Sequence, residues 1–136
     1  IAGVDYINDS KATNADATSK ALVCYHKIYW ILGGQPKEGG LQGLEPLMNR
    51  VAHAYLIGEA APQFAAWLHE NKVAYTHCGT LDVAVDAAHR DAQNHAKHPD
   101  LLGNGVVLLS PACASWDQFK SFEHRGQVFC ELVEKL

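Results

Sequence analysis

Short apolar runs alternate with helix-type patterns along this 136-residue chain. Strands and helices that alternate at this spacing predict βαβ units and a mostly parallel sheet, with right-handed crossovers that place helices on both faces. We therefore expect one Rossmann-like, three-layer α/β domain over residues 1–136. The expected strands cover residues 4–7, 28–32, 51–57, 73–78 and 105–109; the expected helices cover about 15–26, 44–50, 61–68, 80–92 and 122–136, with a polar loop at 95–104.

Apolar residues at helical spacing predict the faces that the helices bury. The run at 28–32 is instead apolar without a break, as in a strand covered on both faces. The predicted helix faces are Ala17, Ala21, Cys24 and Tyr25; Ala61, Phe64, Ala65 and Leu68; Leu81, Ala84, Val85, Ala88 and Ala92; and Phe122, Phe129, Val133 and Leu136.

A polar cluster, NDSKATN at residues 8–14, lies where the first strand passes into the first helix. Open α/β sheets bind their ligands at strand ends of this kind. Asp9 can accept hydrogen bonds from ribose hydroxyls, Lys11 supplies a point charge for a phosphoryl group, and the last two residues are short hydrogen-bonding side chains. The simpler interpretation is a capped helix start, with a capping box from Thr13 to Asp16 and a solvated lysine. These residues alone leave both interpretations open.

Three glycine-rich stretches were candidates for phosphate binding, and one remains. Residues 103–105 lack the third glycine of the dinucleotide fingerprint, and residues 34–39 are followed by Gly40-Leu41 where a phosphate loop requires Lys-Ser/Thr. Gly33-Gly34 with Lys37 instead forms a flexible strand exit that delivers one lysine. Because parallel strands end at one edge of a sheet, we expect these strand ends to form one site: Asn8, Gly33, Gly58, Cys78 and Ser110.

The segment after the last strand combines packing residues with a predicted anion site. Ser115 with Gln118 predicts a capping box, and a helix N-terminus there would bind an anion. Cys113 has no histidine beside it in the sequence, so we expect it to be packed rather than nucleophilic. Trp116 and Phe119 are expected in the core. The histidines lack the H-x-x-x-H spacing of a zinc helix, and no metal site is expected.

Composition excludes several classes of protein. The formal charge of −4 without a basic stripe argues against a nucleic-acid partner, and no apolar run reaches the ~18 residues of a membrane span. Four cysteines without a C-x-x-C pair predict reduced, mostly buried thiols in a cytosolic protein. The chain opens on a strand without a starting methionine, so we expect it to be part of a longer protein.

Three stretches together carry a family resemblance: NDSKATN at 8–14, ILGG at 31–34 with Lys37, and LLSPACASWDQFKSFEHRG at 108–126. They resemble the C-terminal domain of the Mur ligases, and their sequences are most similar to those of the branch that adds D-glutamate. The family usually has Asp-Gly before the lysine, where this chain has Gln35-Pro36, and proline stiffens the loop. The resemblance covers nearly the whole chain.

The resemblance implies the acceptor domain of a monomeric, cytoplasmic, ATP-dependent ligase of peptidoglycan synthesis. The complete enzyme would phosphorylate UDP-N-acetylmuramoyl-L-alanine with ATP and Mg²⁺, and D-glutamate would attack the acyl phosphate. Its phosphate loop, Mg²⁺ ligands, carbamylated lysine and UDP-sugar site would lie on central and N-terminal domains absent here, so this chain alone would be inactive. The implied contacts are Lys37 and Thr13 with the α-carboxylate of D-glutamate, Ser115 and the backbone around Phe122 with its side-chain carboxylate, Lys11 with the phosphoryl group, and Asp9, Lys11 and Asn14 with the nucleotide.

Two alternatives remain open at this point. A sibling ligase domain would take a different amino acid, although the sequences of residues 8–14 and 110–126 argue against this alternative. A non-catalytic module would keep the fold and an anion pocket without the chemistry. A gene that continues upstream into a phosphate-loop domain would argue against that second alternative.

Overall fold

The computed structural model describes residues 3–97 and 105–136. Strands and helices alternate along the chain, as the sequence predicts. The elements are β1 (Asp5–Asn8), α1 (Ala15–Leu22), β2 (Ile28–Gly33), the 3-10 helix η1 (Glu45–Arg50), β3 (Val51–Ile57), α2 (Ala61–Glu70), β4 (Tyr75–Gly79), α3 (Leu81–Lys97), β5 (Val106–Leu109) and α4 (Phe122–Glu134).

The five strands form one sheet in the order β1-β5-β2-β3-β4, and every pair is parallel. The central strand β2 pairs with β5 on one side and with β3 on the other, and all six of its residues are buried. Its unbroken apolar sequence is what this position requires, because neither face of the strand meets water. The predicted parallel α/β sheet is confirmed.

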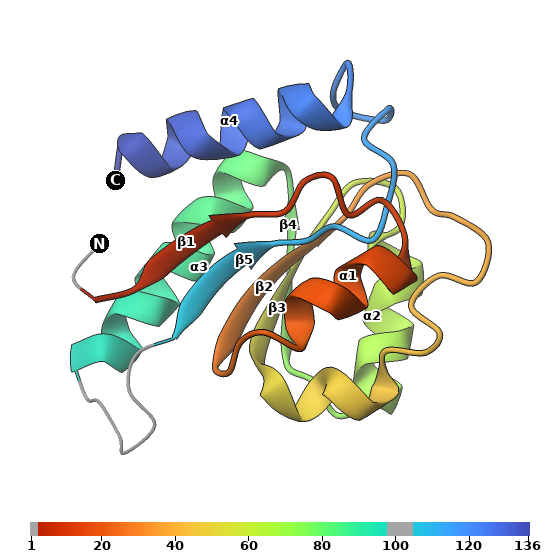
Figure 1. The fold of residues 1–136 in the computed structure, drawn as a ribbon, viewed down its shortest axis with the longest axis horizontal. Coiled ribbons are helices and arrows are strands. Elements are labelled where there is room, and N and C mark those ends of the chain that lie inside the picture. Colours follow the sequence, from red (N-terminus) through yellow and green to blue (C-terminus); the bar gives the residue numbers. More distant parts are fainter. Residues whose placement is uncertain (1–2, 98–104) are drawn as a thin grey trace.

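Each face of the sheet is covered by its own helices (Figure 1). Trp30 and Leu32 pack in the core layer beneath α1, α2 and η1, whereas Tyr29 and Ile31 pack in the layer beneath α3 and α4. The alternation follows from the two-residue period of a strand, which sends successive side chains to opposite faces. The three-layer arrangement is therefore confirmed.

Two of the predicted helix faces are confirmed, one is confirmed in part and one is not. The predicted residues Phe64, Ala65 and Leu68 of α2 are buried, and so is the whole predicted face of α3. In α4, Phe129 is buried and Val133 packs against the core, but Leu136 is 40% exposed and follows the end of the helix. Among the described residues, no helix is long and apolar enough to cross a membrane.

The first helix departs most from the prediction. α1 ends at Leu22, and its buried residues are Thr18 and Leu22 rather than the predicted alanine, cysteine and tyrosine face. Thr18 can be buried because its hydroxyl has a polar partner in Ser110: it donates to the Ser110 carbonyl oxygen at 3.5 Å and lies 3.1 Å from Ser110 Oγ. The spacing of apolar residues does not reveal a polar side chain that is buried with a hydrogen-bond partner.

The third helix is longer than predicted. α3 runs to Lys97, so His95 lies in a helix rather than in a loop. The rest of the predicted loop, residues 98–104, lies outside the described residues.

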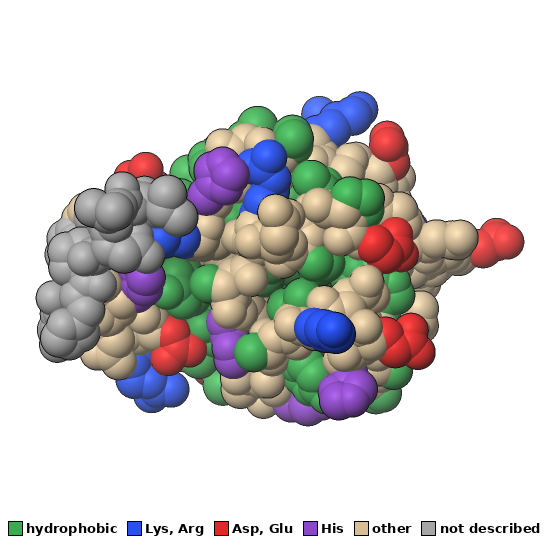
Figure 2. Space-filling view, turned by 90° about the horizontal axis from the view of Figure 1, so that it is seen from below, with side chains coloured by type: hydrophobic (Ala, Val, Ile, Leu, Met, Phe, Trp, Pro, Cys, Tyr) green, Lys and Arg blue, Asp and Glu red, His purple; other side chains and the backbone are tan. Residues whose placement is uncertain are grey.

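On the face seen in Figure 2, acidic and basic side chains are interspersed rather than gathered into a patch of one sign.

Candidate functional site at the carboxyl edge of the sheet

The loops that leave the carboxyl ends of the strands gather on one side of the molecule (Figure 1). Residues 110–121 run across this edge and contact the other exits, so the predicted convergence of strand ends is confirmed. The contacts are Ala112 N–H to Ala12 O (3.0 Å), Gly33 N–H to Pro111 O (3.0 Å), Gln35 N–H to Ala114 O (2.9 Å), Glu59 N–H to Asp117 Oδ2 (3.0 Å) and Gln118 Nε2 to Gly79 O (2.8 Å).

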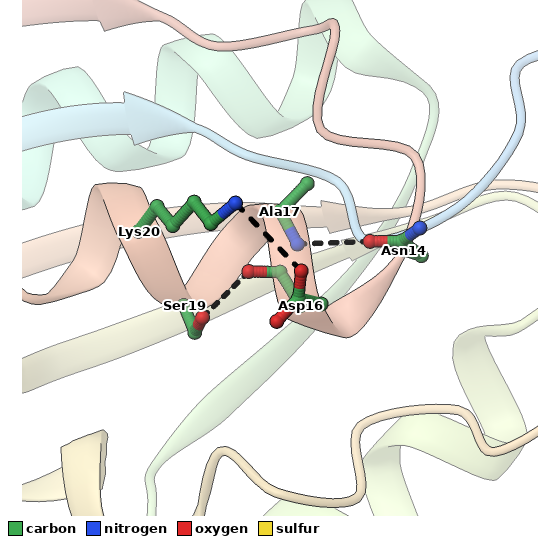
Figure 3. Close-up of polar contacts among 5 residues, drawn as sticks. All are labelled: Asn14, Asp16, Ala17, Ser19 and Lys20. Carbon is green, nitrogen blue, oxygen red and sulfur yellow. Dashed lines mark hydrogen bonds and ion pairs between the residues drawn. The ribbon is translucent and has the colours of Figure 1, made fainter.

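The turn at residues 8–14 ends in a helix cap. Asn14 is the N-cap of α1, and its side-chain oxygen accepts a hydrogen bond from the Ala17 N–H at 2.8 Å (Figure 3). The predicted capping box from Thr13 to Asp16 is therefore wrong. Asp16 instead joins an exposed ion pair within α1, and pairs of that kind contribute little to stability. The side chain of Asn14 thus fixes where the helix begins.

The carboxylate of Asp9 is oriented by a buried network. Ser110 donates its hydroxyl hydrogen to Asp9 Oδ2 at 2.8 Å. Ser110 is itself fully buried, and its carbonyl accepts a hydrogen bond from Trp30 Nε1 at 2.8 Å. Burial raises the pKa of Asp9 above its usual value, and the hydrogen bond from Ser110 opposes that rise. The carboxylate is therefore held in place before any ligand binds.

Lys11 is exposed and lines two hollows at this edge. One hollow, of about 500 Å³, lies against α1 and includes Asp9. The other, of about 380 Å³, lies between the turn and the start of α4 and includes Asp9 and Phe122. The structure thus brings together predicted site residues from opposite ends of the chain.

Lys37 is exposed on the loop after β2 and lines a hollow of about 300 Å³ with Asn14. Its charge also reaches Cys113. Burial raises the pKa of the Cys113 thiol to about 12, and the positive charges of Arg125 and Lys37 oppose this rise. Because Lys37 shares a hollow with Asn14, and Gln35 of the same loop donates to Ala114 O, the Lys37 loop lies beside both the turn at 8–14, where Thr13 is half-buried, and the segment at 110–121.

Ser115 is buried, with 2% of its surface exposed, and does not begin a helix. Its carbonyl accepts hydrogen bonds from the N–H groups of Gln118 and Phe119 at 3.2 and 2.8 Å, which closes a tight turn. α4 begins only at Phe122, with Ser121 as its N-cap. The predicted capping box and the helix N-terminal anion site at Ser115 are therefore wrong. The helix N-terminus lies at Phe122 and borders one of the two hollows described above.

One buried residue near the site was not predicted from the sequence. Arg125 is 1% exposed and lies beneath the turn at 8–14 and the segment at 110–121. Its guanidinium donates to Ser10 and to the carbonyl of Cys113. A signal was available, because Arg125 falls at helical spacing between Phe122 and Phe129 on the predicted apolar stripe. A charged residue on a buried stripe calls for buried hydrogen-bond partners.

No family model matches the chain, but curated relatives do. The UDP-N-acetylmuramoylalanine–D-glutamate ligase of Paramagnetospirillum magneticum is 61% identical over 132 residues, which is 97% of this chain and 28% of the relative. The ligases of the same name from Rhodospirillum rubrum and Nitrobacter winogradskyi are 58% and 56% identical, over 100% and 99% of this chain and 27% and 28% of the relatives. The chain is a close homologue of one part of these ligases. It spans little more than a quarter of their length.

The resemblance to Mur ligases is thus confirmed, but the packing predictions for several residues in the ligase-like stretches are corrected. Trp116 was expected in the core and is 65% exposed, whereas Phe119 is partly buried against the layer beneath α3 and α4. The cysteines were expected to be mostly buried. Only Cys113 is buried; Cys24 and Cys130 are exposed, and the fourth is intermediate.

The cysteines give a direct test of this arrangement. At neutral pH, we expect a thiol reagent such as DTNB to modify Cys24 and Cys130 quickly, Cys78 more slowly and Cys113 only after unfolding. The reason is that Cys113 is buried with a pKa of about 12, and the thiolate is the reacting species. In Cys113→Ser, the fast and slow reactions should be unchanged, and the thiol that reacts only after unfolding should be missing. Four equally fast thiols in the folded chain would contradict the buried position of Cys113.

Proposed function

We propose that this chain is the D-glutamate acceptor domain of an ATP-dependent ligase of cytoplasmic peptidoglycan synthesis. The observation that carries the proposal is the convergence of Asp9, Lys11, Lys37 and Phe122 at one sheet edge. This edge occurs in a chain that is 61% identical to part of a relative named as a D-glutamate ligase.

The acceptor, D-glutamate, carries two carboxylates and therefore needs a cation and several fixed donors. In the proposal, Lys37 and Thr13 hold the α-carboxylate, and Ser115 with the main chain at Phe122 holds the side-chain carboxylate. The first N–H groups of a helix have no partner within the helix and favour an anion. The start of α4 at Phe122 supports its part of this assignment.

The proposed reaction has two steps. The γ-phosphoryl group of ATP passes to the carboxylate of UDP-N-acetylmuramoyl-L-alanine, which gives an acyl phosphate and ADP. The amine of D-glutamate attacks the acyl carbon, loses its proton, and the tetrahedral intermediate expels phosphate to leave the amide. In the proposal, Lys11 stabilises negative charge on the transferred phosphoryl group, and Asp9 and Asn14 bind the nucleotide.

Mg²⁺ would accompany ATP in this reaction, but the residues that the structure describes do not form a site for it on their own. Within residues 3–97 and 105–136, no group of three or more His, Cys, Asp or Glu side chains is arranged to hold a metal ion. We therefore assign no metal ligand to this chain. The proposal places the metal ligands, the phosphate loop and the UDP-sugar site on the other domains of the complete ligase, and closure of the domains would complete the site.

Alone, this chain should neither form amide bonds nor release phosphate from ATP above background, because it carries only part of the proposed site. The measurement is phosphate release at high protein concentration with all three substrates present. Turnover that is abolished by Lys11→Ala and kept by Lys135→Ala would contradict this expectation, since it would show that the chain is catalytically complete.

The complementary test uses a chimeric ligase, in which this chain replaces the matching segment of the Paramagnetospirillum magneticum relative. We expect phosphate release that depends on D-glutamate. An amino-acid panel separates the alternatives in the same assay. Preference for another amino acid would indicate a sibling ligase, and a folded chimera that uses no amino acid would indicate a non-catalytic module.

A further inference from the structure

Arg125 of α4 is a buried cation that forms no ion pair with any carboxylate of the described residues. Its guanidinium instead makes three hydrogen bonds: Nε to Ser10 Oγ at 2.8 Å, Nη2 to Ser10 O at 2.6 Å and Nη1 to Cys113 O at 3.0 Å. The negative charge of Asp117 acts on Arg125 without forming an ion pair with it, and burying a charge without a directly paired counter-ion is costly. An apolar side chain would fill the same space at a lower cost, so the arginine needs a reason other than the stability of the core.

The guanidinium lies where three loops meet. Ser10 belongs to the turn that carries Lys11 and Thr13, and Cys113 belongs to the segment that carries Ser115. The third loop is the exit of β2, which leads to Lys37. A Cβ atom added at Gly34 of that exit would lie 3.5 Å from Arg125 Nη1 and 2.5 Å from Ala114 O. Two of these loops are hydrogen-bonded to the guanidinium and the third passes close to it, and each of the three carries a residue assigned to D-glutamate.

The same contacts also hold the start of α4 against the turn at 8–14. The Ser10 hydroxyl accepts from Arg125 and donates to the carbonyl oxygen of Phe122 at 2.7 Å. The neighbouring Gly126 allows this close approach, since a Cβ atom there would lie 2.9 Å from Asn8 Nδ2 and 3.2 Å from Ser10 Cβ. The position of the Phe122 main chain thus depends on the same contacts as the position of the turn.

We infer that Arg125 is a positioning residue for the acceptor, whose planar guanidinium sets the spacing between the turn at 8–14 and the segment at 110–121. The inference rests on the proposed function, because it concerns the D-glutamate site. The geometry of the guanidinium, rather than its charge, is what the site needs. A lysine keeps the charge but has a single nitrogen, which cannot reproduce the fork that reaches Ser10 and Cys113 together.

The test compares Arg125→Lys and Arg125→Met in the chimeric ligase. A misplacement of about 1 Å can cost about a hundred-fold in a positioned reaction. We therefore expect the KM for D-glutamate to rise about ten- to a hundred-fold in both variants, while the KM for UDP-N-acetylmuramoyl-L-alanine stays unchanged. The matched control is Arg50→Met. Arg50 also donates to main-chain carbonyls, those of Val23 and Tyr25 at 3.2 and 3.1 Å, but at the opposite edge of the sheet.

The changes in KM and kcat distinguish a positioning role of Arg125 from a purely structural one. A purely structural role would reduce the amount of folded enzyme and lower the apparent kcat without moving the KM for D-glutamate. An unchanged KM in Arg125→Lys would overturn the inference, and this variant remains informative if Arg125→Met fails to fold. A chimeric ligase with unchanged Arg125 that ignores D-glutamate would instead contradict the proposed function.

Discussion

Replacing Lys37 by alanine in the chimeric ligase should weaken the use of D-glutamate by about ten- to a hundred-fold or more. In the proposed site, Lys37 is the cation that holds the α-carboxylate. Hydrogen bonds to charged groups are worth about 1.5–3 kcal/mol, and about 1.4 kcal/mol corresponds to a factor of ten. Because Lys37 is exposed and supports no core packing, the loss should appear in recognition rather than in folding.

The measurement is steady-state kinetics with each substrate varied in turn. The KM for D-glutamate should rise, whereas those for ATP and UDP-N-acetylmuramoyl-L-alanine should change much less. Lys135→Ala is the matched control, because it removes the same charge from the far end of α4 (Figure 1). An unchanged KM for D-glutamate in Lys37→Ala would mean that the rigid Pro36 directs the lysine elsewhere. The α-carboxylate would then need another partner.

The centre of the sheet could be predicted from the sequence because β2 and β5 are buried on both faces and are therefore unbroken apolar runs. The unbroken run of β2 and the boundaries of β3 needed no long-range information. The face of α1 could not be predicted in the same way. Its buried Thr18 is stabilised by Ser110, 92 residues away in the sequence, and apolar spacing carries no information about such a partner.

The candidate site was predictable in outline but not in detail. Parallel strands end at one edge, so the meeting of residues 8–14, the Lys37 loop and residues 110–121 followed from the fold. The local helix ends did not follow. Ser115 closes a turn before α4 begins, and Arg125 bonds to Ser10 across 115 residues of sequence. Contacts of this kind depend on how the loops cross the edge, which local patterns do not specify.

Replacing Gly33 by alanine should destabilise the chain more than any loop substitution on its surface. Gly33 ends β2 with a φ of +126°, and a Cβ atom there would lie 1.9 Å from the carbonyl oxygen of Ile57 in β3. Overpacking and backbone strain each cost about 1–3 kcal/mol, so we expect a loss of about 2–6 kcal/mol. Domains of this size have only about 5–15 kcal/mol of stability in total.

The measurement is a thermal melt followed by circular dichroism, which should be cooperative for the unaltered chain because it buries its own two core layers. We expect the Tm of Gly33→Ala to fall by about 10–20 °C, or the chain to be unfolded at room temperature. Gly43→Ala is the matched control. Gly43 has a φ of +97°, but a Cβ atom there would meet nothing within 4 Å.

The control separates the two causes of the loss at Gly33. Gly43→Ala incurs only the backbone strain, so its fall in Tm should be clearly smaller. Equal falls would mean that the exit of β2 does not approach Ile57 as closely as the structure shows. That approach matters for the site, because the chain leaves Gly33 toward Lys37 and the Gly33 N–H is hydrogen-bonded to Pro111 at the start of the segment that carries Ser115. A side chain at this position would therefore move the cation and the segment that the proposed D-glutamate site requires together.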